Sequence, residues 1–98
     1  MNLAAEDVLG RLRQRQRRAR EEFGVEMIGI VGSLARGDAR PDSDIDVVLA
    51  AVRAISLFDL AGLQAELEDD LRRRVDLILT EDLPADRRRY IERDLVRL

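Results

Sequence analysis

Apolar positions in the first half of the chain follow a helical period and then a strand-like run. Residues 4–23 carry apolar side chains on one side of a helix and arginines on the others, and Gly24 ends this pattern as a C-terminal glycine does. Residues 25–31 (VEMIGIV) form a short apolar run with β-branched side chains, which is typical of a buried strand. Residues 32–37 predict a tight turn with room for one helical turn, and residues 38–43 (DARPDS) predict a polar loop.

The second half of the chain repeats this alternation. Residues 44–51 (DIDVVLAA) predict a second strand, and residues 75–80 (VDLILT) predict a third. Between them, residues 56–74 predict a helix that begins with a Ser-x-x-Asp capping pattern and carries leucines on one stripe. After a turn over residues 81–84, residues 86–98 predict a last helix. Its inward-facing residues are expected to be Ile91, Leu95 and Leu98.

This order of elements predicts an α/β (α+β) fold, with a single small domain over residues 1–98 and a three-stranded mixed sheet with flanking helices. The helix between the second and third strands makes them parallel, with a right-handed crossover. The short connection between the first two strands favours antiparallel pairing, which makes the second strand central. The end of the first strand and the starts of the other two should therefore meet at one edge of the sheet.

The composition narrows the chemistry that this edge can perform. The 98 residues contain no Cys and no His, and all 17 basic residues are arginine. Thiolate and imidazole chemistry and a catalytic lysine are therefore excluded, so acid–base and metal chemistry fall to Asp and Glu, whose oxygens suit hard cations such as Mg²⁺. The net charge is −3, and no apolar run has the length of a membrane span or the pattern of a signal peptide, so we expect a cytoplasmic protein that does not bind membranes.

Three aspartates fall at the predicted sheet edge. Asp44 and Asp46 are two residues apart on one strand, so their carboxylates point to the same face. Asp76 stands at the start of the neighbouring strand. Like charges this close repel one another unless a cation lies between them. The three carboxylates therefore predict a site for two divalent cations, the arrangement used for phosphoryl or nucleotidyl transfer.

The turn beside these aspartates has the features of a phosphate site. Gly32 lets the backbone approach a ligand, Ser33 offers a hydroxyl and an N–H, and the guanidinium of Arg36 suits phosphate oxygens. The spacing Gly-x₄-Gly is also that of a P-loop, but Asp38 stands where that loop has lysine. Structural roles remain open, since Arg36 could instead pair with Asp38 or Asp42.

The sequence of the turn and of the following strand resembles a known signature. Residues 32–37 (GSLARG) and residues 43–47 (SDIDV) are similar to the GSxARG…SDxD pattern of polymerase-beta-type nucleotidyltransferases. They resemble in particular the minimal nucleotidyltransferase (MNT) antitoxins that pair with HEPN-domain toxins. Val47, where leucine is usual, is the one departure. The order of elements extends the resemblance to most of the chain and implies the polymerase-beta-like fold.

The resemblance also implies roles for individual residues. Asp44 and Asp46 would ligate both Mg²⁺ ions, and Asp76 would complete the site and help to deprotonate the attacking hydroxyl. The residues expected at the nucleotide are Gly32, Ser33, Arg36 and Ser43.

For such antitoxins, the resemblance implies that AMP is transferred from ATP to a tyrosine hydroxyl of the partner HEPN toxin, which silences it. The chain leaves no room for a separate acceptor-binding domain, so a protein partner would bring its own binding surface and a hetero-oligomer is expected. The alternative is an antitoxin that neutralises its partner by binding alone, without catalysis.

Clusters of arginine also allow a third hypothesis, a DNA-binding regulator that uses the first helix. We expect solvated helix faces instead of a nucleic-acid site, because 20 acidic residues offset the arginines and no aromatic residues are interleaved with them. Tyr90, the only tyrosine, is expected to be a packing residue, with self-modification as an alternative.

Overall fold

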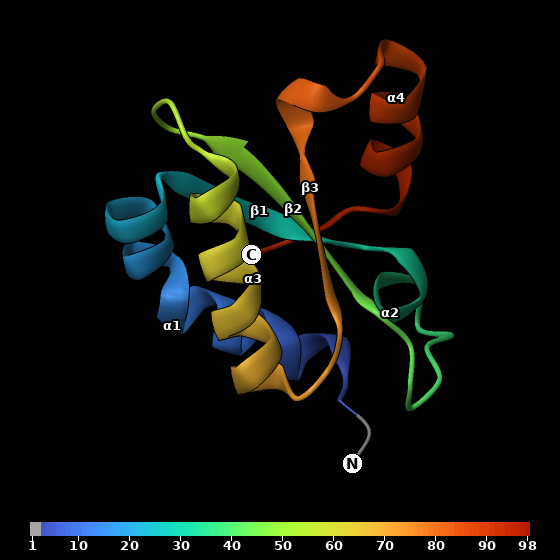
Figure 1. Ribbon diagram of the computed structural model, residues 1–98. Helices are drawn as coiled ribbons and strands as arrows, with labels where there is room; N and C mark the ends of the chain where they lie inside the picture. The colour runs from blue at the N-terminus through green and yellow to red at the C-terminus, as the bar shows by residue number, and fades with distance from the viewer. Residues whose placement is uncertain (1–2) are drawn as a thin grey trace.

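A computed structural model of the chain describes residues 3–98. Its elements are α1 (Ala5–Phe23), β1 (Val25–Val31), α2 (Gly32–Arg36), β2 (Ile45–Ala51), α3 (Leu57–Leu71), β3 (Val75–Leu79), a 3₁₀ turn η1 (Thr80–Asp82), α4 (Ala85–Asp94) and β4 (Val96–Arg97). The sheet order is β3-β2-β1-β4 (Figure 1). β1 and β2 are antiparallel, β2 and β3 are parallel, and β2 lies between β1 and β3, so the predicted pairing of these three strands is confirmed.

The prediction for the C-terminal segment is wrong in one respect. The last helix ends at Asp94, and the chain then forms a short fourth strand, β4, antiparallel to β1. Gly29 of β1 makes this pairing possible, because a Cβ at that position would collide with the carbonyl oxygen of Val96. The sheet therefore has four strands, and β4 pairs with the edge of β1 that faces away from β2.

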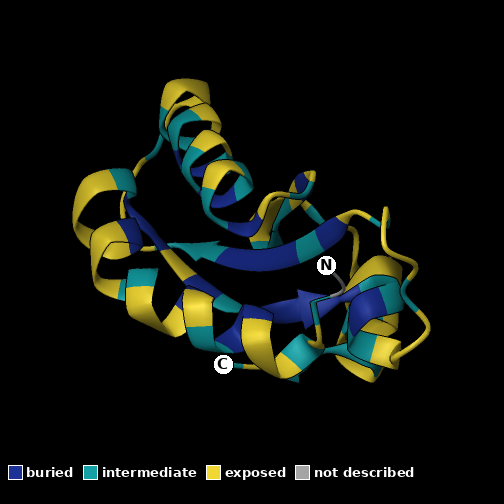
Figure 2. Ribbon diagram, turned by 90° about the horizontal axis from the view of Figure 1, so that it is seen from below, coloured by how far each residue is buried: buried dark blue, intermediate teal, exposed yellow. Residues whose placement is uncertain are grey.

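Helices α1 and α3 lie side by side on one face of the sheet and close the core. The fully buried helix residues are Val8, Leu9, Leu12 and Ala19 of α1 and Leu63 and Leu67 of α3. They pack on the alternate residues of the central strand, Ile45, Val47 and Leu49. In Figure 2 the strands are mostly in the buried colour, whereas the helices keep long exposed stretches. This face supplies most of the apolar burial that stabilises the fold.

The ends of α3 follow from local hydrogen bonds. The predicted capping box is confirmed, since the backbone N–H of Asp59 donates to the Ser56 hydroxyl at 3.2 Å and the N–H of Ser56 donates to the Asp59 carboxylate at 2.8 Å. The helix ends three residues earlier than expected, because Arg72 adopts the left-handed conformation (φ 56°) and its N–H donates to Glu68 O. The chain then turns directly into β3.

Arginines of α1 form ion pairs with α3. Arg11 and Arg15 each approach Asp70 at 3.0 Å, and Arg18 donates to Glu66 at 2.8 Å. The hydrogen bond and charge of Arg18 lower the pKa of the Glu66 carboxyl against the opposing effect of burial. This helix face was predicted to be solvated, but the structure shows that part of it crosslinks the two helices.

Helix α4 lies over the opposite face of the sheet, apart from α1 and α3 (Figure 1). No residue of α4 is buried. Ile91, Leu95 and Leu98 are half-buried, so their inward orientation is confirmed only in part. Tyr90 was expected to pack, yet it is 67% exposed. None of the helices within residues 3–98 combines the length and the apolar character needed to cross a membrane.

Candidate functional site

The strand register brings the predicted aspartates to one edge of the sheet. Asp46 of β2 is paired with Val31 at the end of β1 and with Asp76 of β3. Because side chains alternate along a strand and Ile45 points into the core, Asp44 and Asp46 point to the opposite face. Asp44 lies just before the strand, which begins one residue later than expected, and it is exposed.

Gly32 places the backbone of the α2 turn directly against the carboxylate of Asp46. Its φ is +83°, a backbone conformation that residues with a side chain rarely adopt. A Cβ at this position would also collide with Oδ2 of Asp46. The glycine is therefore favoured by the left-handed turn, and a side chain in its place would displace the Asp46 carboxylate. This contact brings the GSLARG turn and the DID segment together at the sheet edge.

The electrostatics of the site single out Asp46. Partial burial raises the pKa of this carboxyl, and the negative charges of Asp76 and Asp44 raise it further. Hydrogen bonding with Asp76 acts in the same direction, and the positive charge of Arg36 opposes it. Asp44 and Asp76 thus both act on the carboxyl of Asp46. Without a counter-charge, Asp46 is held in an environment that disfavours its ionised form.

The donor atoms at this edge are the kind that Mg²⁺ prefers, because all three side chains offer carboxylate oxygens. As they stand, no three acidic side chains within residues 3–98 are arranged as a set of metal ligands. The shared influence of Asp44 and Asp76 on Asp46 fits a cation site in its chemistry. The assignment of these residues as metal ligands therefore stays a prediction.

The other predicted nucleotide contacts have structural partners. Arg36 lies 3.5 Å from Asp38 and 3.5 Å from Asp94, so one of its two suggested pairings is present and Asp42 is not involved. The Ser43 hydroxyl accepts a hydrogen bond from the N–H of Arg40 at 2.8 Å. Ser33 is half-buried in the first turn of α2. Arg36 thus ties the α2 turn to the end of α4.

Two further residues hold the loop before Asp44, and the sequence did not indicate them. The guanidinium of Arg73 donates to Ser43 O at 3.1 Å, and the N–H of Ile45 donates to Arg74 O at 2.8 Å. Both contacts join the end of α3 to the start of β2. No local pattern could identify them, because the partners are about thirty residues apart and meet only when β2 and β3 pair.

Comparison with known proteins supports this geometry. The family model for the nucleotidyltransferase domain matches residues 12–98. A curated relative, the protein adenylyltransferase MntA of Thermococcus cleftensis, is 34% identical over 94 residues, which cover 96% of this chain and 95% of the relative.

Solved structures share the fold. A structure described as a minimal nucleotidyltransferase has a TM-score of 0.73 and 33% identity, and the match covers 92% of this chain and 95% of the other. A complex of tri-AMPylated Shewanella oneidensis HEPN toxin with MNT antitoxin has a TM-score of 0.60 at 18% identity, over 82% of this chain and 59% of the other, which shows a likeness of fold. The sheet edge, the glycine turn and these matches together establish that the chain belongs to the nucleotidyltransferase domain family.

Proposed function

We propose that this chain is a cytoplasmic, Mg²⁺-dependent adenylyltransferase that transfers AMP from ATP to a tyrosine hydroxyl of a partner HEPN toxin, and so acts as an antitoxin. The register that sets Asp46 beside Asp76, with Gly32 against Asp46, is the observation that carries the proposal. The 34% identity with the protein adenylyltransferase MntA supports a protein acceptor. The complex of a HEPN toxin with an MNT antitoxin supports the partner, and a related toxin–antitoxin structure with AMP-PNP supports an adenine nucleotide.

Asp44, Asp46 and Asp76 would hold two Mg²⁺ ions. Burial is the largest cause of the raised pKa of Asp46, and repulsion from Asp76 and Asp44 adds to it. This repulsion supports the role, because bound cations would offset it. When bound, Mg²⁺ supplies positive charge that neutralises the phosphates and orients them for an in-line displacement.

The residues of the chain divide the remaining tasks. Gly32 allows the backbone to approach the triphosphate, and Ser33 donates from its hydroxyl and N–H. In the transfer, the acceptor oxygen bonds to the α-phosphorus, the bond from that phosphorus to the oxygen bridging to the β-phosphorus breaks, and pyrophosphate leaves with the electron pair. Asp76 takes the proton of the acceptor hydroxyl. Arg36 would reach the outer phosphates only after leaving its carboxylate partners, and Ser43 would contribute from the loop.

Label transfer from α-labelled ATP tests the proposal. The purified protein is mixed with Mg²⁺ and the protein encoded beside it, or with total lysate from its source, and the acceptor band is followed. We expect labelling by the wild type and none by Asp46→Asn, whereas Asp42→Asn, which removes an exposed carboxylate of the preceding loop, should label normally. Binding of the partner should be equal for all three proteins. Full neutralisation of the toxin by Asp46→Asn would favour the alternative, an antitoxin that acts by binding alone.

A further inference from the structure

The sheet face that carries the aspartates continues into an apolar groove. Along β2 and β3 the next residues on this face after Asp46 and Asp76 are Val48 and Ile78, which are themselves paired across the two strands. Two residues along a strand span about 7 Å. The apolar floor of the groove therefore begins immediately beside the carboxylates, on the same side of the sheet.

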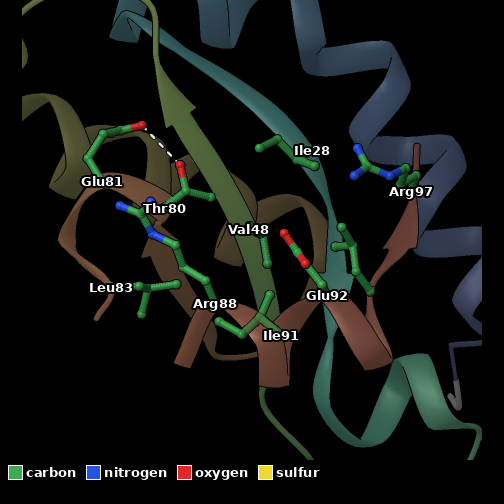
Figure 3. Close-up of a pocket in the computed structure, with 10 residues that line it drawn as sticks. Ile28, Val48, Thr80, Glu81, Leu83, Arg88, Ile91, Glu92 and Arg97 are labelled. Atoms are coloured by element: carbon green, nitrogen blue, oxygen red, sulfur yellow. Dashed lines mark hydrogen bonds between the residues drawn. The ribbon is translucent and has the colours of Figure 1, made fainter. Parts of the chain in front are cut away.

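The groove lies between this face and α4. One hollow of about 390 Å³ is lined by apolar side chains that include Ile28, Val48, Leu83 and Ile91, and Val48 and Ile91 face each other across it (Figure 3). A second hollow of about 530 Å³ shares Leu83 and Ile91 and extends to Ile78 and the exposed Tyr90. Volumes of this size accommodate several side chains of a ligand.

The arginines around the groove differ from those of α1 in their ion pairing. Within residues 3–98, the five arginines of the α4–β4 segment form no ion pair, whereas three of the six arginines of α1 pair with α3. These five are Arg87, Arg88, Arg89, Arg93 and Arg97. The carboxylates nearby are partly engaged, because Asp94 pairs with Arg36 and Glu81 accepts from the N–H of Ala51. Within residues 3–98, Asp86 and Glu92 of α4 also form no ion pair, so residues 85–98 hold five arginines against three carboxylates, a net charge of +2 in a chain of net charge −3.

We propose that this groove is the docking site of the acceptor protein, and that its occupant is an acidic segment with apolar side chains. The inference rests on the proposed function, since it assigns the partner's place in the same reaction. The apolar side chains would fill the two hollows, and the carboxylates would face the arginines of α4. The continuity of the floor with Asp46 and Asp76 would bring a hydroxyl of the docked protein to the site of transfer.

A charge-reversal pair tests the docking site separately from the chemistry. Arg87→Glu/Arg88→Glu reverses two exposed charges of α4, and Arg13→Glu/Arg17→Glu makes the same change on the exposed face of α1. Binding to the HEPN-domain protein encoded beside this chain is measured by calorimetry without ATP, and label transfer is measured in parallel. We expect the α4 variant to bind about tenfold more weakly or worse and the α1 variant to bind within about twofold of wild type.

Transfer kinetics and nucleotide binding complete the test. The α4 variant should show a raised KM for the acceptor with kcat little changed, and its binding of ATP with Mg²⁺ should equal that of the wild type. Tyr90→Ala, which truncates an exposed side chain at the rim, should weaken acceptor binding in the same way.

The possible failures are distinguishable. Equal acceptor binding by the α4 and α1 variants would overturn the docking site and leave the enzymatic proposal standing. If the wild type binds the acceptor with this charge dependence but transfers no label, the enzymatic proposal fails and the docking site remains. Absence of acceptor binding by the wild type would overturn both.

Discussion

The two faces of the central sheet serve different purposes. On the α1–α3 face, alternate strand residues such as Val47 and Leu49 are fully buried under two helices, and arginine–carboxylate pairs join those helices. On the α4 face, Val48 is also buried, but Asp46 is only half-buried and the covering helix has no buried residue. A strand of period two can therefore place stability on one face and chemistry on the other.

The largest expected effect sharpens this contrast in stability. Leu67→Ala, in the fully buried layer of α3, should lower the free energy of unfolding by about 2–5 kcal/mol, because it leaves a cavity. Ile91→Ala, in the half-buried wall of the groove, should cost only about 1 kcal/mol, because less apolar surface is lost and water can fill the space. Urea unfolding of both variants measures the difference, and equal losses would show that the α4 face is as firmly packed as the α1–α3 face.

The second prediction concerns the chemistry of the α4 face. Gly32→Ala should lower the rate of label transfer by roughly a hundredfold, equivalent to about 3 kcal/mol of transition-state stabilisation, because the new Cβ displaces Asp46. Gly37→Ala is the matched control. Its φ of +84° is as strained, but a Cβ there meets no atom within 4 Å. Equal activity losses in the two variants would attribute the effect to backbone strain and not to the Asp46 contact.

The sequence allowed much of the fold to be predicted, because the α1–α3 face is determined by local periodicity. The leucine stripe of α3 and the run of residues 25–31 gave elements close to the observed ones. The C-terminal segment was harder to predict. Residues 95–98 continue a helical apolar pattern, but their strand pairing depends on Gly29, which lies far away in the sequence and leaves room for Val96.

For the candidate site, spacing was enough to predict which aspartates meet. Asp44 and Asp46 share a face by strand alternation, and Asp76 follows from the parallel pairing of β3. The partners of Arg36 could be predicted only in part, since Asp38 is two residues away but Asp94 comes from the other end of the chain. Contacts of that kind depend on where α4 lies, which no local pattern specifies.

A smaller effect on the stability of the fold is expected when the charge of Asp46 is removed. The folded protein raises the pKa of this carboxyl, so the ionised form is disfavoured by folding and the associated loss of stability appears as the pH rises through that pKa. Asp46→Asn should therefore be slightly more stable than wild type at pH 7, and the difference should vanish below the ordinary pKa of 3.8. Urea midpoints at the two pH values measure it, with Asp42→Asn as the control that should show no such gain.

The smallest expected effect on stability concerns Glu66 on the α1–α3 face, where the fold lowers the pKa of a carboxyl instead of raising it. Arg18 lowers the pKa of Glu66, so the ionised carboxyl favours the folded state above the ordinary pKa of 4.5, and this stability is lost as the pH falls through the lowered value. Glu66→Gln should therefore lower the urea midpoint slightly at pH 7, by less than Ile91→Ala does, and match wild type in strong acid. Glu21→Gln is the control, because its pair with Arg17 is largely exposed and contributes little. If Glu66→Gln is as stable as Glu21→Gln at pH 7, the pair of Arg18 with Glu66 does not stabilise the contact between the two helices in solution, and the difference in stability between the two faces would then rest on the apolar layer and the pairs with Asp70.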